Sequence, residues 1–506
     1  MRSKKALVDT ISSILYELVF AICGMILPRL ILEAFGSSYN GITSSITQFL
    51  SYMSLLVSGI GAVSRAALYK PLADKDNVGI SAVFNATDRF MKRSALIFLG
   101  SLFAMAALYP IFVSYEFDWL FSFTLVLILG AGTVVQYFFG STAMMVLQSD
   151  QKMYIVSTIR IGTTILNTLL AFVLIKLGCG IHMVKLGSAF AFSLNPIIAN
   201  IYVRRHYKID KKVPPNLEKI RQRWDAFWQA VAHFVHNNVP VVVLTVFADI
   251  KEVSVFTVYN YVVANIRQVL VSFVSSFGAA FGNMLAKEEY DLARKNLRAF
   301  EMIIFNLVSI VYTTMGIMIL PFVSIYTSGI TDVEYIRPTF ALIATVAGAV
   351  SCFRIPYHCV VEAAGHFKQT RNGAFVEAML NIVVSIVLVL KIGLVGVAIG
   401  TLVATVFRSV QYSTHVSKHI IKRSNKFFWI HILVTIVISA ATVAISQLIF
   451  TFETPNYLYW AGKSVLVVLT AAILTLVTDM LFFKKDTMYM VEKIKLLIFK
   501  KKLTVK

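Results

Sequence analysis

The chain has 506 residues, of which 58% are hydrophobic and 14% are charged, and its formal net charge is +21. Its apolar residues fall in blocks of roughly twenty separated by short polar joints, a pattern typical of helices that cross a membrane. This pattern excludes a soluble multidomain protein, because blocks such as residues 94–113 offer water no polar face. It also excludes a membrane β-barrel. Because basic residues stand at the ends of the blocks, the positive charge indicates membrane orientation rather than nucleic-acid binding.

The blocks predict an all-α polytopic membrane protein with about fourteen transmembrane helices. The first block continues directly from residues 1–10 and lacks a small-residue cleavage site, so we expect it to remain as an anchor. The predicted spans are centred near residues 20, 54, 103, 132, 165, 192, 239, 269, 311, 348, 382, 405, 438 and 470.

Lys and Arg residues predict the orientation of these spans. If the N-terminus faces inward, 36 of the 47 basic residues fall on inner segments, namely residues 1–5, 65–93, 152, 204–223, 287–298, 368–371, 418–426 and 484–506. The outer joints hold only Lys176, Lys251, Arg337, Lys391 and Lys463. By the positive-inside rule, both termini are expected on the cytoplasmic side of the membrane.

A weak internal repeat divides the chain into two halves. Residues 166–181 and 380–396 both contain Leu-Asn, an aliphatic run and Lys-(Leu/Ile)-Gly. Six spans separate them, so the halves would be parallel repeats related by an axis along the membrane normal. We expect a six-helix lobe over residues 1–205, a basic cytoplasmic linker over 206–225, a pseudo-symmetric six-helix lobe over 226–417, two extra helices over 418–482 and a basic cytoplasmic tail over 483–506.

Several basic residues fall inside predicted spans, where each costs about 2.5–3.5 kcal/mol at the bilayer centre unless protein or water receives it. Arg29 lies in the outer half of the first span, and Glu17 lies about three turns before it on another side of the helix. Arg267 lies near the middle of the eighth span, with Asn260 on the same face. Arg267 is expected to face a functional cavity or to pair with a carboxylate or helix carbonyl.

Other intramembrane charges have more than one interpretation. Arg354 could join His358 and Glu362 in a structural network within the tenth span, or contact a ligand. The pattern assigns no role to Arg160, Lys185 and Arg408.

The second span has a polar stripe on one helical face. Its members recur at helical spacing and are Ser44, Gln48, Ser51, Ser54, Ser58 and Arg65. Such a stripe lines an aqueous cavity or a tight helix interface, because small serines also pack helices together. Arg65, at its inner end, could also snorkel to the membrane surface.

The seventh span has a second polar face, which would be costly in lipid. It comprises Gln229, His233, His236, Asn237 and Pro240. Two histidines three residues apart without a third ligand do not make a metal site, so a hydrogen-bonding or proton-linked role is favoured.

Three stretches resemble a known family. Residues 26–56 (ILPRLILEAFGSSYNGITSSITQFLSYMSLL), 67–76 (ALYKPLADKD) and 393–407 (GLVGVAIGTLVATVF) resemble segments of bacterial polysaccharide flippases. These are the O-antigen and capsule translocases of the multidrug/oligosaccharidyl-lipid/polysaccharide exporter superfamily. The resemblance implies two six-helix lobes around a central cavity that opens alternately to each side of the membrane. It also implies that spans one, two, seven and eight line this cavity.

The resemblance implies translocation of an undecaprenyl-diphosphate-linked oligosaccharide. Arg29, Arg65 and Arg267 would hold its pyrophosphate, since the planar arginine fork donates paired hydrogen bonds to phosphate. The residues expected to contact the glycan or line the cavity are Ser44, Gln48, Ser51, Ser54, His233, His236, Asn237 and Asn260. Glu17, His233 and His236 are candidates for ion coupling.

We expect a transporter rather than an enzyme, with no cofactor, no resident metal and no nucleic-acid partner. Its expected partners are the lipid-linked oligosaccharide, membrane lipids, and a polysaccharide polymerase with its export machinery.

Three alternative functions stay open: a lipid II flippase, a cation-coupled multidrug antiporter of the same superfamily, and a membrane glycan polymerase or ligase. A drug antiporter would need an acidic cavity, and a polymerase would need a larger outer domain than the short outer joints allow.

Overall fold

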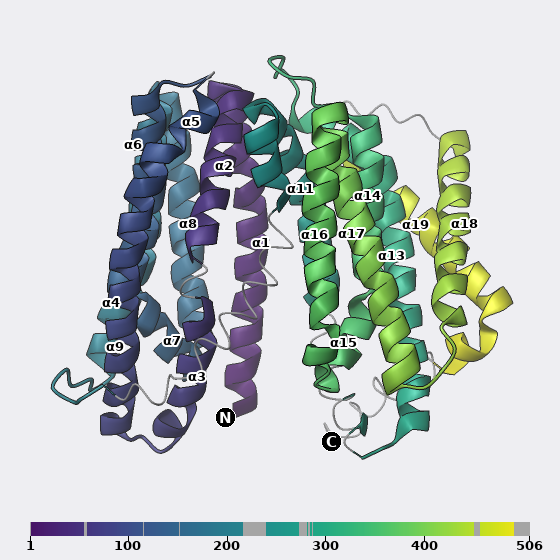
Figure 1. Ribbon diagram of the computed structural model, residues 1–506, viewed down its shortest axis with the longest axis horizontal. Coiled ribbons are helices and arrows are strands. Elements are labelled where there is room, and N and C mark those ends of the chain that lie inside the picture. The colour runs from purple at the N-terminus through teal and green to yellow at the C-terminus, as the bar shows by residue number, and fades with distance from the viewer. Residues whose placement is uncertain are drawn as a thin grey trace. The chain divides into compact units, whose positions relative to one another are not determined.

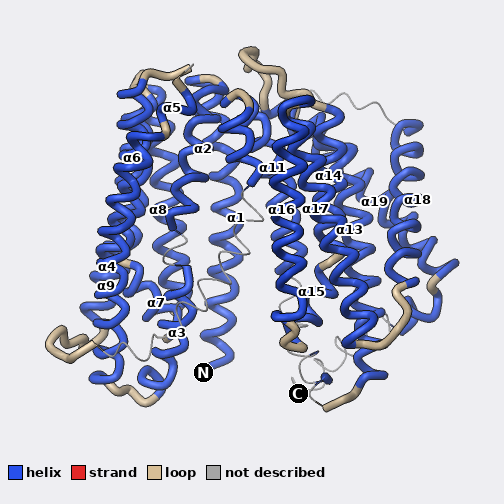
Figure 2. Tube along the Cα trace, viewed as in Figure 1, coloured by secondary structure: helices blue, strands red, loops and turns tan. Residues whose placement is uncertain are grey.

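The computed structural model describes residues 2–54, 58–114, 116–150, 152–215, 239–272, 281, 284–285, 287–449 and 456–489. In these residues all regular structure is helical, and no strand occurs among them (Figure 2). The same residues contain 11 helical segments that are long and apolar enough to cross a membrane. The prediction of an all-α, multi-pass membrane protein is therefore confirmed.

The predicted spans centred near residues 54, 239 and 269 are not among these eleven segments. Two helices occupy the first of these regions, on either side of residues 55–57, which lie outside the described residues. The second region falls largely on residues 216–238, which are also outside them, and a helix over Ile250–Ser272 occupies the third. The count of fourteen stays a prediction.

The chain divides into two compact units. Unit 1 comprises Met1–Ser254 and Gly329–Val333, and unit 2 comprises Val255–Ser328 and Glu334–Lys506. The segment at residues 239–254 therefore belongs with the N-terminal helices. The domain boundaries expected from the sequence stay predictions.

Unit 1 is a bundle in which α1 packs against α8, α8 against α9, α9 against α6 and α6 against α4 (Figure 1). Its helices are α1 (Arg2–Phe35), α2 (Ser37–Ser54), α3 (Ser58–Ala73), α4 (Asn77–Leu108), α5 (Pro110–Val113), α6 (Trp119–Phe139), α7 (Ser141–Ser149), α8 (Met153–Lys176) and α9 (Ile181–His206). Local signals set their ends: the Asp76 carboxylate accepts a hydrogen bond from Val78 N and caps α4. Pro110 begins α5, where its missing N–H costs nothing.

A hydrogen-bonded triad connects α8 and α9 at one end of unit 1. Tyr207 donates its hydroxyl to Asp150 Oδ2 at 2.5 Å, and Lys152 Nζ donates to the Tyr207 oxygen at 2.9 Å. Burial and the bond to Asp150 raise the pKa of Tyr207. Burial lowers the pKa of Lys152, but its contacts with Asp150 and Tyr207 outweigh this effect and raise it. The triad connects the start of α8 to the end of α9. Because their pKa values are raised, Tyr207 and Lys152 are both protonated at neutral pH.

Gly140 separates α6 from α7 at a point where α9 comes very close. A Cβ atom placed on Gly140 would lie 2.0 Å from Pro196 Cβ and 2.2 Å from Pro196 Cα. Because Pro196 Cα belongs to the backbone, rotating a side chain cannot relieve this clash.

We expect Gly140→Ala to destabilise the protein by about 1–3 kcal/mol or more, as overpacking does elsewhere. Thermal unfolding of the purified protein in detergent measures the effect. Gly162→Ala is the matched control, because a Cβ on Gly162 meets nothing within 4 Å. Equal melting temperatures for the two variants would contradict the close approach.

Unit 2 packs α16 against α17, α17 against α14 and α14 against α13. Its helices are α11 (Ile250–Ser272, from Val255 onward), α13 (Tyr290–Tyr326), α14 (Pro338–Phe353), α15 (Ile355–Ala363), α16 (Phe367–Ile392), α17 (Leu394–His415), the π-helical turn η3 (Val416–Ile420), α18 (Lys426–Ile449) and α19 (Tyr457–Phe482). The last two helices pack on α13.

Polar bonds attach α18 and α19 to α13 at three levels. The hydroxyls of Thr313 and Ser439 are 2.6 Å apart, and Asn306 Nδ2 donates to Asp479 Oδ2 at 2.5 Å. Trp460 Nε1 donates to the Met318 carbonyl at 2.9 Å. The two C-terminal helices are therefore an integral part of unit 2.

The repeat seen in the sequence has a structural counterpart in both units. Asn167 on α8 and Asn381 on α16 are both buried. A glycine with positive φ follows each helix: Gly178 at 73°, two residues after the end of α8, and Gly393 at 57°, directly after α16. Matching residue types thus recur at similar places in α8 and α16.

Candidate functional site

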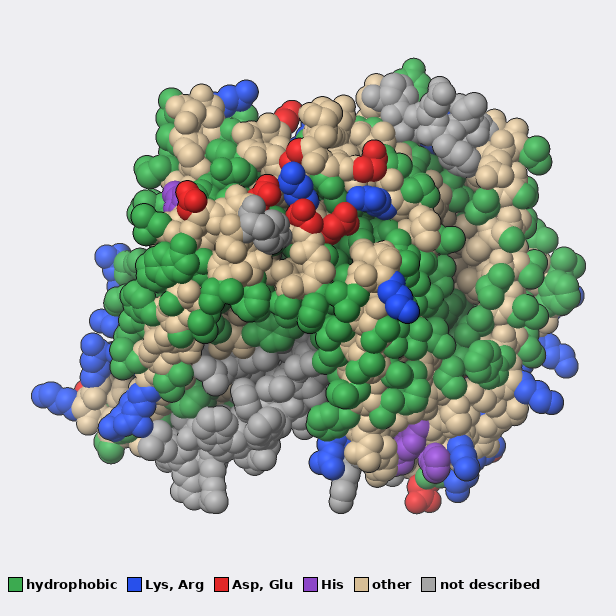
Figure 3. All heavy atoms as spheres, turned by 45° about the horizontal axis from the view of Figure 1, so that its top comes forward, with side chains coloured by type: hydrophobic (Ala, Val, Ile, Leu, Met, Phe, Trp, Pro, Cys, Tyr) green, Lys and Arg blue, Asp and Glu red, His purple; other side chains and the backbone are tan. Residues whose placement is uncertain are grey.

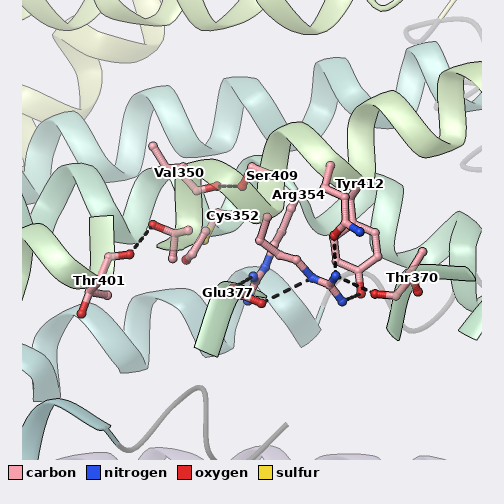
Figure 4. A network of polar contacts seen from close by, with 12 residues as sticks. Val350, Cys352, Arg354, Thr370, Glu377, Thr401, Ser409 and Tyr412 are labelled. Carbon is pink, nitrogen blue, oxygen red and sulfur yellow. Dashed lines mark hydrogen bonds and ion pairs between the residues drawn. The ribbon is translucent and has the colours of Figure 1, made fainter. Parts of the chain in front are cut away.

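A cluster of charged side chains lies within the membrane-spanning helices of unit 2 (Figure 4). At its centre is Glu377 on α16, whose side chain is 5% exposed. Arg354 Nη1 donates to Glu377 Oε1 at 2.5 Å, and Arg408 Nε lies 3.3 Å from Glu377 Oε2. Each carboxylate oxygen therefore faces its own guanidinium, as a buried carboxylate requires.

Helix geometry brings these three residues together. Arg354 stands at the junction where α14 ends and α15 begins, just before Ile355 and Pro356. Arg408 lies on α17, which approaches α16 so closely that a Cβ on Gly400 would lie 2.8 Å from Ser385 N. The small residues on α17 thus let its arginine reach the carboxylate on α16.

Arg408 is held by several neutral groups besides Glu377. Its Nη1 donates to the Thr370 carbonyl at 2.9 Å, and its Nη2 donates to the Tyr412 hydroxyl at 2.8 Å. The guanidinium also lies 4.1 Å from the centroid of the Tyr412 ring. With these partners, Arg408 is a fixed part of the framework.

Arg267 on α11 adds a third guanidinium to this region. It lies within electrostatic range of Arg354 and Glu377. Val263, one turn earlier on α11, lies near Gly348 of α14 and Tyr312 of α13, because a Cβ on Gly348 would lie 2.9 Å from Val263 Cγ1 and 2.6 Å from Tyr312 Cε1. Three guanidiniums against one carboxylate give this cluster, called here the basic cluster, a formal charge of +2.

The ion pairs of Arg354 differ from one sequence interpretation. The sequence allowed a network of Arg354, His358 and Glu362 within one span. In the structure His358 Nδ1 and Glu362 Oε2 lie 3.6 Å apart at a half-exposed position, and Arg354 pairs with Glu377 on α16 instead. Interaction across helices therefore replaces the expected interaction along one helix.

Unit 1 places its two candidate arginines in different surroundings. Arg29 Nη2 lies 3.4 Å from Glu33 Oε1, one turn further along α1, and the Arg29 side chain is 22% exposed. Arg65 Nη1 donates to Gln148 Oε1 at 3.3 Å on α7. Glu17 is exposed on α1, next to Tyr16, whose ring lies 5.6 Å from the guanidinium of Arg160. Lys185, on α9, is buried.

The serine stripe is half-buried, and part of it bonds to its own helix. Ser51 donates to the Thr47 carbonyl and Ser54 to the Leu50 carbonyl. Gln48 Nε2 is buried and has no hydrogen-bond partner among the described residues. Ser44 is half-buried, and the side chain of Ser58 lies outside the described residues.

A neighbouring face of α2, which the sequence analysis missed, makes the tighter contacts. Asn40 Nδ2 donates to Ser254 Oγ at 2.7 Å, and the hydroxyls of Ser45 and Thr245 are 2.8 Å apart. All four residues are buried. Their small size is the signal that could have identified them, because small polar residues are typical of close helix contacts in membranes.

The remaining candidates are not brought into these groups. His233, His236 and Asn237 lie outside the described residues, as does Gln229. Asn260 is exposed on α11. The assignments of Arg29, Arg65 and Arg267 to a pyrophosphate, and of the polar faces to a glycan, stay predictions.

Comparison with known proteins places the fold. No protein-family model matches the sequence, and no curated protein matches it. Among solved structures, the lipid II flippase MurJ in an inward closed conformation is 14% identical, with a TM-score of 0.68 and coverage of 95% of this chain and 99% of that chain.

Multidrug transporters are also similar. An inward-facing multidrug resistance MATE family transporter of the MOP superfamily has a TM-score of 0.59, with 14% identity and coverage of 82% of this chain and 98% of that chain. The eukaryotic MATE transporter AtDTX14 has a TM-score of 0.53, with 14% identity and coverage of 84% and 99%. The chain is a multi-pass membrane protein with the fold shared by MurJ and the MATE transporters.

Proposed function

We propose that the protein is a flippase of the multidrug/oligosaccharidyl-lipid/polysaccharide exporter superfamily. It moves an undecaprenyl-diphosphate-linked oligosaccharide from the inner to the outer leaflet of the bacterial cytoplasmic membrane by alternating access. Both termini lie in the cytoplasm, and membrane lipids surround the two units. A polysaccharide polymerase and export machinery would use the translocated product.

The observation that supports this proposal most is the basic cluster of unit 2. Its charge is positive inside the membrane-spanning part of the chain, where every charge is costly unless function or pairing retains it. A pyrophosphate needs such a site, because its charged oxygens cannot cross hydrocarbon unaided and arginine donates paired hydrogen bonds to them. In this proposal Arg267 binds the pyrophosphate, while Glu377 fixes Arg354 and Arg408.

Arg29 and Arg65 of unit 1 bind the same pyrophosphate at other stages of transport. Moving negative charge outward across an inside-negative membrane is favourable by about 2.3 kcal/mol per charge per 100 mV. The membrane potential therefore assists export if the phosphate charges move uncompensated. Glu17 and the histidines of the seventh span are the candidates for ion coupling.

A lipid II flippase is the second candidate, and one observation favours it. Residues 418–506 make up 89 of the 506 residues, so the 95% coverage in the match to MurJ includes most of this C-terminal segment. The MATE match at 82% coverage leaves out a share of the chain as large as that segment. A cation-coupled drug exporter is less well supported, because the basic cluster would repel a cationic drug.

The test is leaflet exchange in liposomes. The purified protein is reconstituted with fluorescent undecaprenyl-diphosphate-linked oligosaccharide or fluorescent lipid II, and a membrane-impermeant quencher reports the label that reaches the outer leaflet. We expect exchange several times faster than in protein-free liposomes, and faster still with a potential that favours export of negative charge. The preferred lipid distinguishes the two candidates. Exchange no faster than in protein-free liposomes, at every imposed potential and ion gradient, would overturn the proposal, and cationic dye efflux would then be assayed.

A further inference from the structure

Unit 1 contains a small polar pocket that the proposed transport mechanism does not use. Its volume is about 100 Å³. Its lining comes from α4, α6, α7, α9 and the loop after α9, and comprises Phe84, Asn85, Asp88, Lys92, Phe138, Phe139, Gly140, Thr142, Ala143, Asn200, Arg204 and Lys211. All of these residues belong to one compact unit, so the pocket is a feature of that unit alone.

The pocket lies where α6 ends. Along most of its length α6 packs against α4 on one side and α9 on the other. It ends at Phe139, and after Gly140 the chain continues as α7, which packs against α3 and α9. Just past the last turn of α6, the space between α4 and α9 is lined by the first turn of α7, which also packs against α4. No side chain caps this end of α7, so its first N–H groups add positive potential.

Basic side chains surround this gap. Lys92 Nζ lies 2.7 Å from Asp88 Oδ2, and Asp88 is the one acidic residue among the described lining residues. Arg204 uses its Nε to donate to Asn200 Oδ1 at 2.9 Å, and the described residues show no other bond from its guanidinium. Three basic groups against one carboxylate leave the pocket with a formal charge of +2.

The third basic group, Lys211, lies in the loop after α9, and hydrogen bonds fix this loop to α4. Asn85 Nδ2 donates to the carbonyls of Asp210 and Val213, at 3.0 and 2.8 Å, and Asp210 N donates to Ser81 Oγ at 3.0 Å. These bonds place Lys211 on the pocket wall. In Figure 1 the loop projects at the lower left, beside the ends of α4 and α9, and Figure 3 shows Lys and Arg side chains along that flank.

The sequence pattern predicts that the pocket lies near the depth of the lipid headgroups. Lys92 and Arg204 mark the points where the polar ends of α4 and α9 meet their apolar blocks, on the side that the charge bias assigns to the cytoplasm. Next to them the bundle presents apolar surface, with Phe139 54% exposed and Ile201 47% exposed. A phosphate in the pocket could thus remain attached to acyl chains that lie along α6 and α9.

We propose that this pocket binds the phosphate group of an anionic phospholipid of the inner leaflet. Basic pockets between transmembrane helices on the cytoplasmic side are suited to such headgroups. The volume admits a headgroup phosphate but not a whole lipid, so the glycerol and acyl chains stay outside. The bound lipid bridges α4, α9 and the clamped loop, and it stabilises the inner end of unit 1.

The test compares two double variants that remove equal charge. Lys92→Gln/Arg204→Gln removes two cations of the pocket lining, and Arg93→Gln/Arg205→Gln removes the next cation in the sequence after each of them. All four side chains are exposed, but Arg93 and Arg205 do not line the pocket. Each purified protein in neutral detergent is titrated with phosphatidylglycerol, phosphatidylcholine or inorganic phosphate, and bound lipid is counted by native mass spectrometry alongside thermal unfolding.

We expect phosphatidylglycerol to bind and raise the melting temperature of the wild type and of the Arg93/Arg205 variant. Its apparent affinity for the Lys92/Arg204 variant should be roughly tenfold or more weaker, since each basic group near a lipid surface adds to binding. Lys211→Glu, on the loop, should weaken phosphatidylglycerol binding in the same way. It replaces the Lys92/Arg204 variant in the test if that variant does not fold. The proposal is overturned if both double variants lose affinity equally, if phosphatidylcholine binds as well, or if inorganic phosphate alone reproduces the stabilisation.

Discussion

Replacing Glu377 with alanine should destabilise the protein by about 3–5 kcal/mol, because it leaves two buried guanidiniums without their counter-charge. The Arg354 and Arg408 side chains are only 14% and 7% exposed, so water cannot replace the carboxylate. Thermal unfolding in detergent should show a lower melting temperature, and a second, denaturant-based measurement should agree in direction. Glu377→Gln keeps the shape but not the charge, and should lose most of the same stability.

Two comparisons separate this effect from the general cost of changing a membrane protein. Glu362→Gln changes a carboxylate that is 55% exposed and lies 3.6 Å from a half-exposed histidine, so it should cost less than about 1 kcal/mol. Adding Arg354→Met to Glu377→Met should restore part of the lost stability, since one of the two unpaired charges is removed. If Glu377→Ala and Glu362→Gln melt alike, the carboxylate does not hold the basic cluster together.

Sequence patterns predicted the helices far better than the contacts between them. A block of apolar residues must be helical in a membrane, because only a helix satisfies its own backbone there, so the all-helical, multi-pass fold follows from length and composition. The repeat at residues 166–181 and 380–396 could also be detected from the sequence, because the asparagine and the glycine recur at almost the same spacing in both segments.

The partner of Arg354 could not be predicted from spacing. Rules for residues three or four apart describe one helix, and they correctly pair His358 with Glu362. They cannot identify Glu377, 23 residues further on and on another helix. A usable signal was present, since Glu377 is an acidic residue within an apolar block and such a residue in a membrane needs a cationic partner.

The polar stripe of α2 illustrates a second limit. Its spacing shows that the serines share a face, but a serine can bond to the carbonyl one turn before it without facing water. Ser51 and Ser54 do so. The buried contacts form instead through Asn40 and Ser45, which the stripe did not include. Periodicity thus finds a polar face, and only packing tells which part of it touches another helix.

Replacing Arg267 with alanine should slow transport of the lipid-linked oligosaccharide about 10- to 100-fold, because a hydrogen bond to a charged group is worth about 1.5–3 kcal/mol. In the proposed function, Arg267 binds the phosphate directly, whereas Arg354 and Arg408 are held by Glu377. Arg267→Lys should give an intermediate rate, since lysine keeps the charge but lacks the planar fork. The leaflet-exchange assay in liposomes measures all three rates, with matched amounts of folded protein.

Arg371→Ala is the matched control for this experiment. Arg371 is an exposed arginine on α16 of the same unit, so its loss changes the net charge equally and should leave the rate within about twofold of the wild type. Unfolding of the Arg267→Ala protein should occur close to the wild-type temperature, because Arg354 and Arg408 still neutralise Glu377. A normal melting temperature together with lost exchange would assign Arg267 to the substrate. A wild-type rate in Arg267→Ala would remove the basic cluster from the phosphate path and leave Arg29 and Arg65 as the candidates.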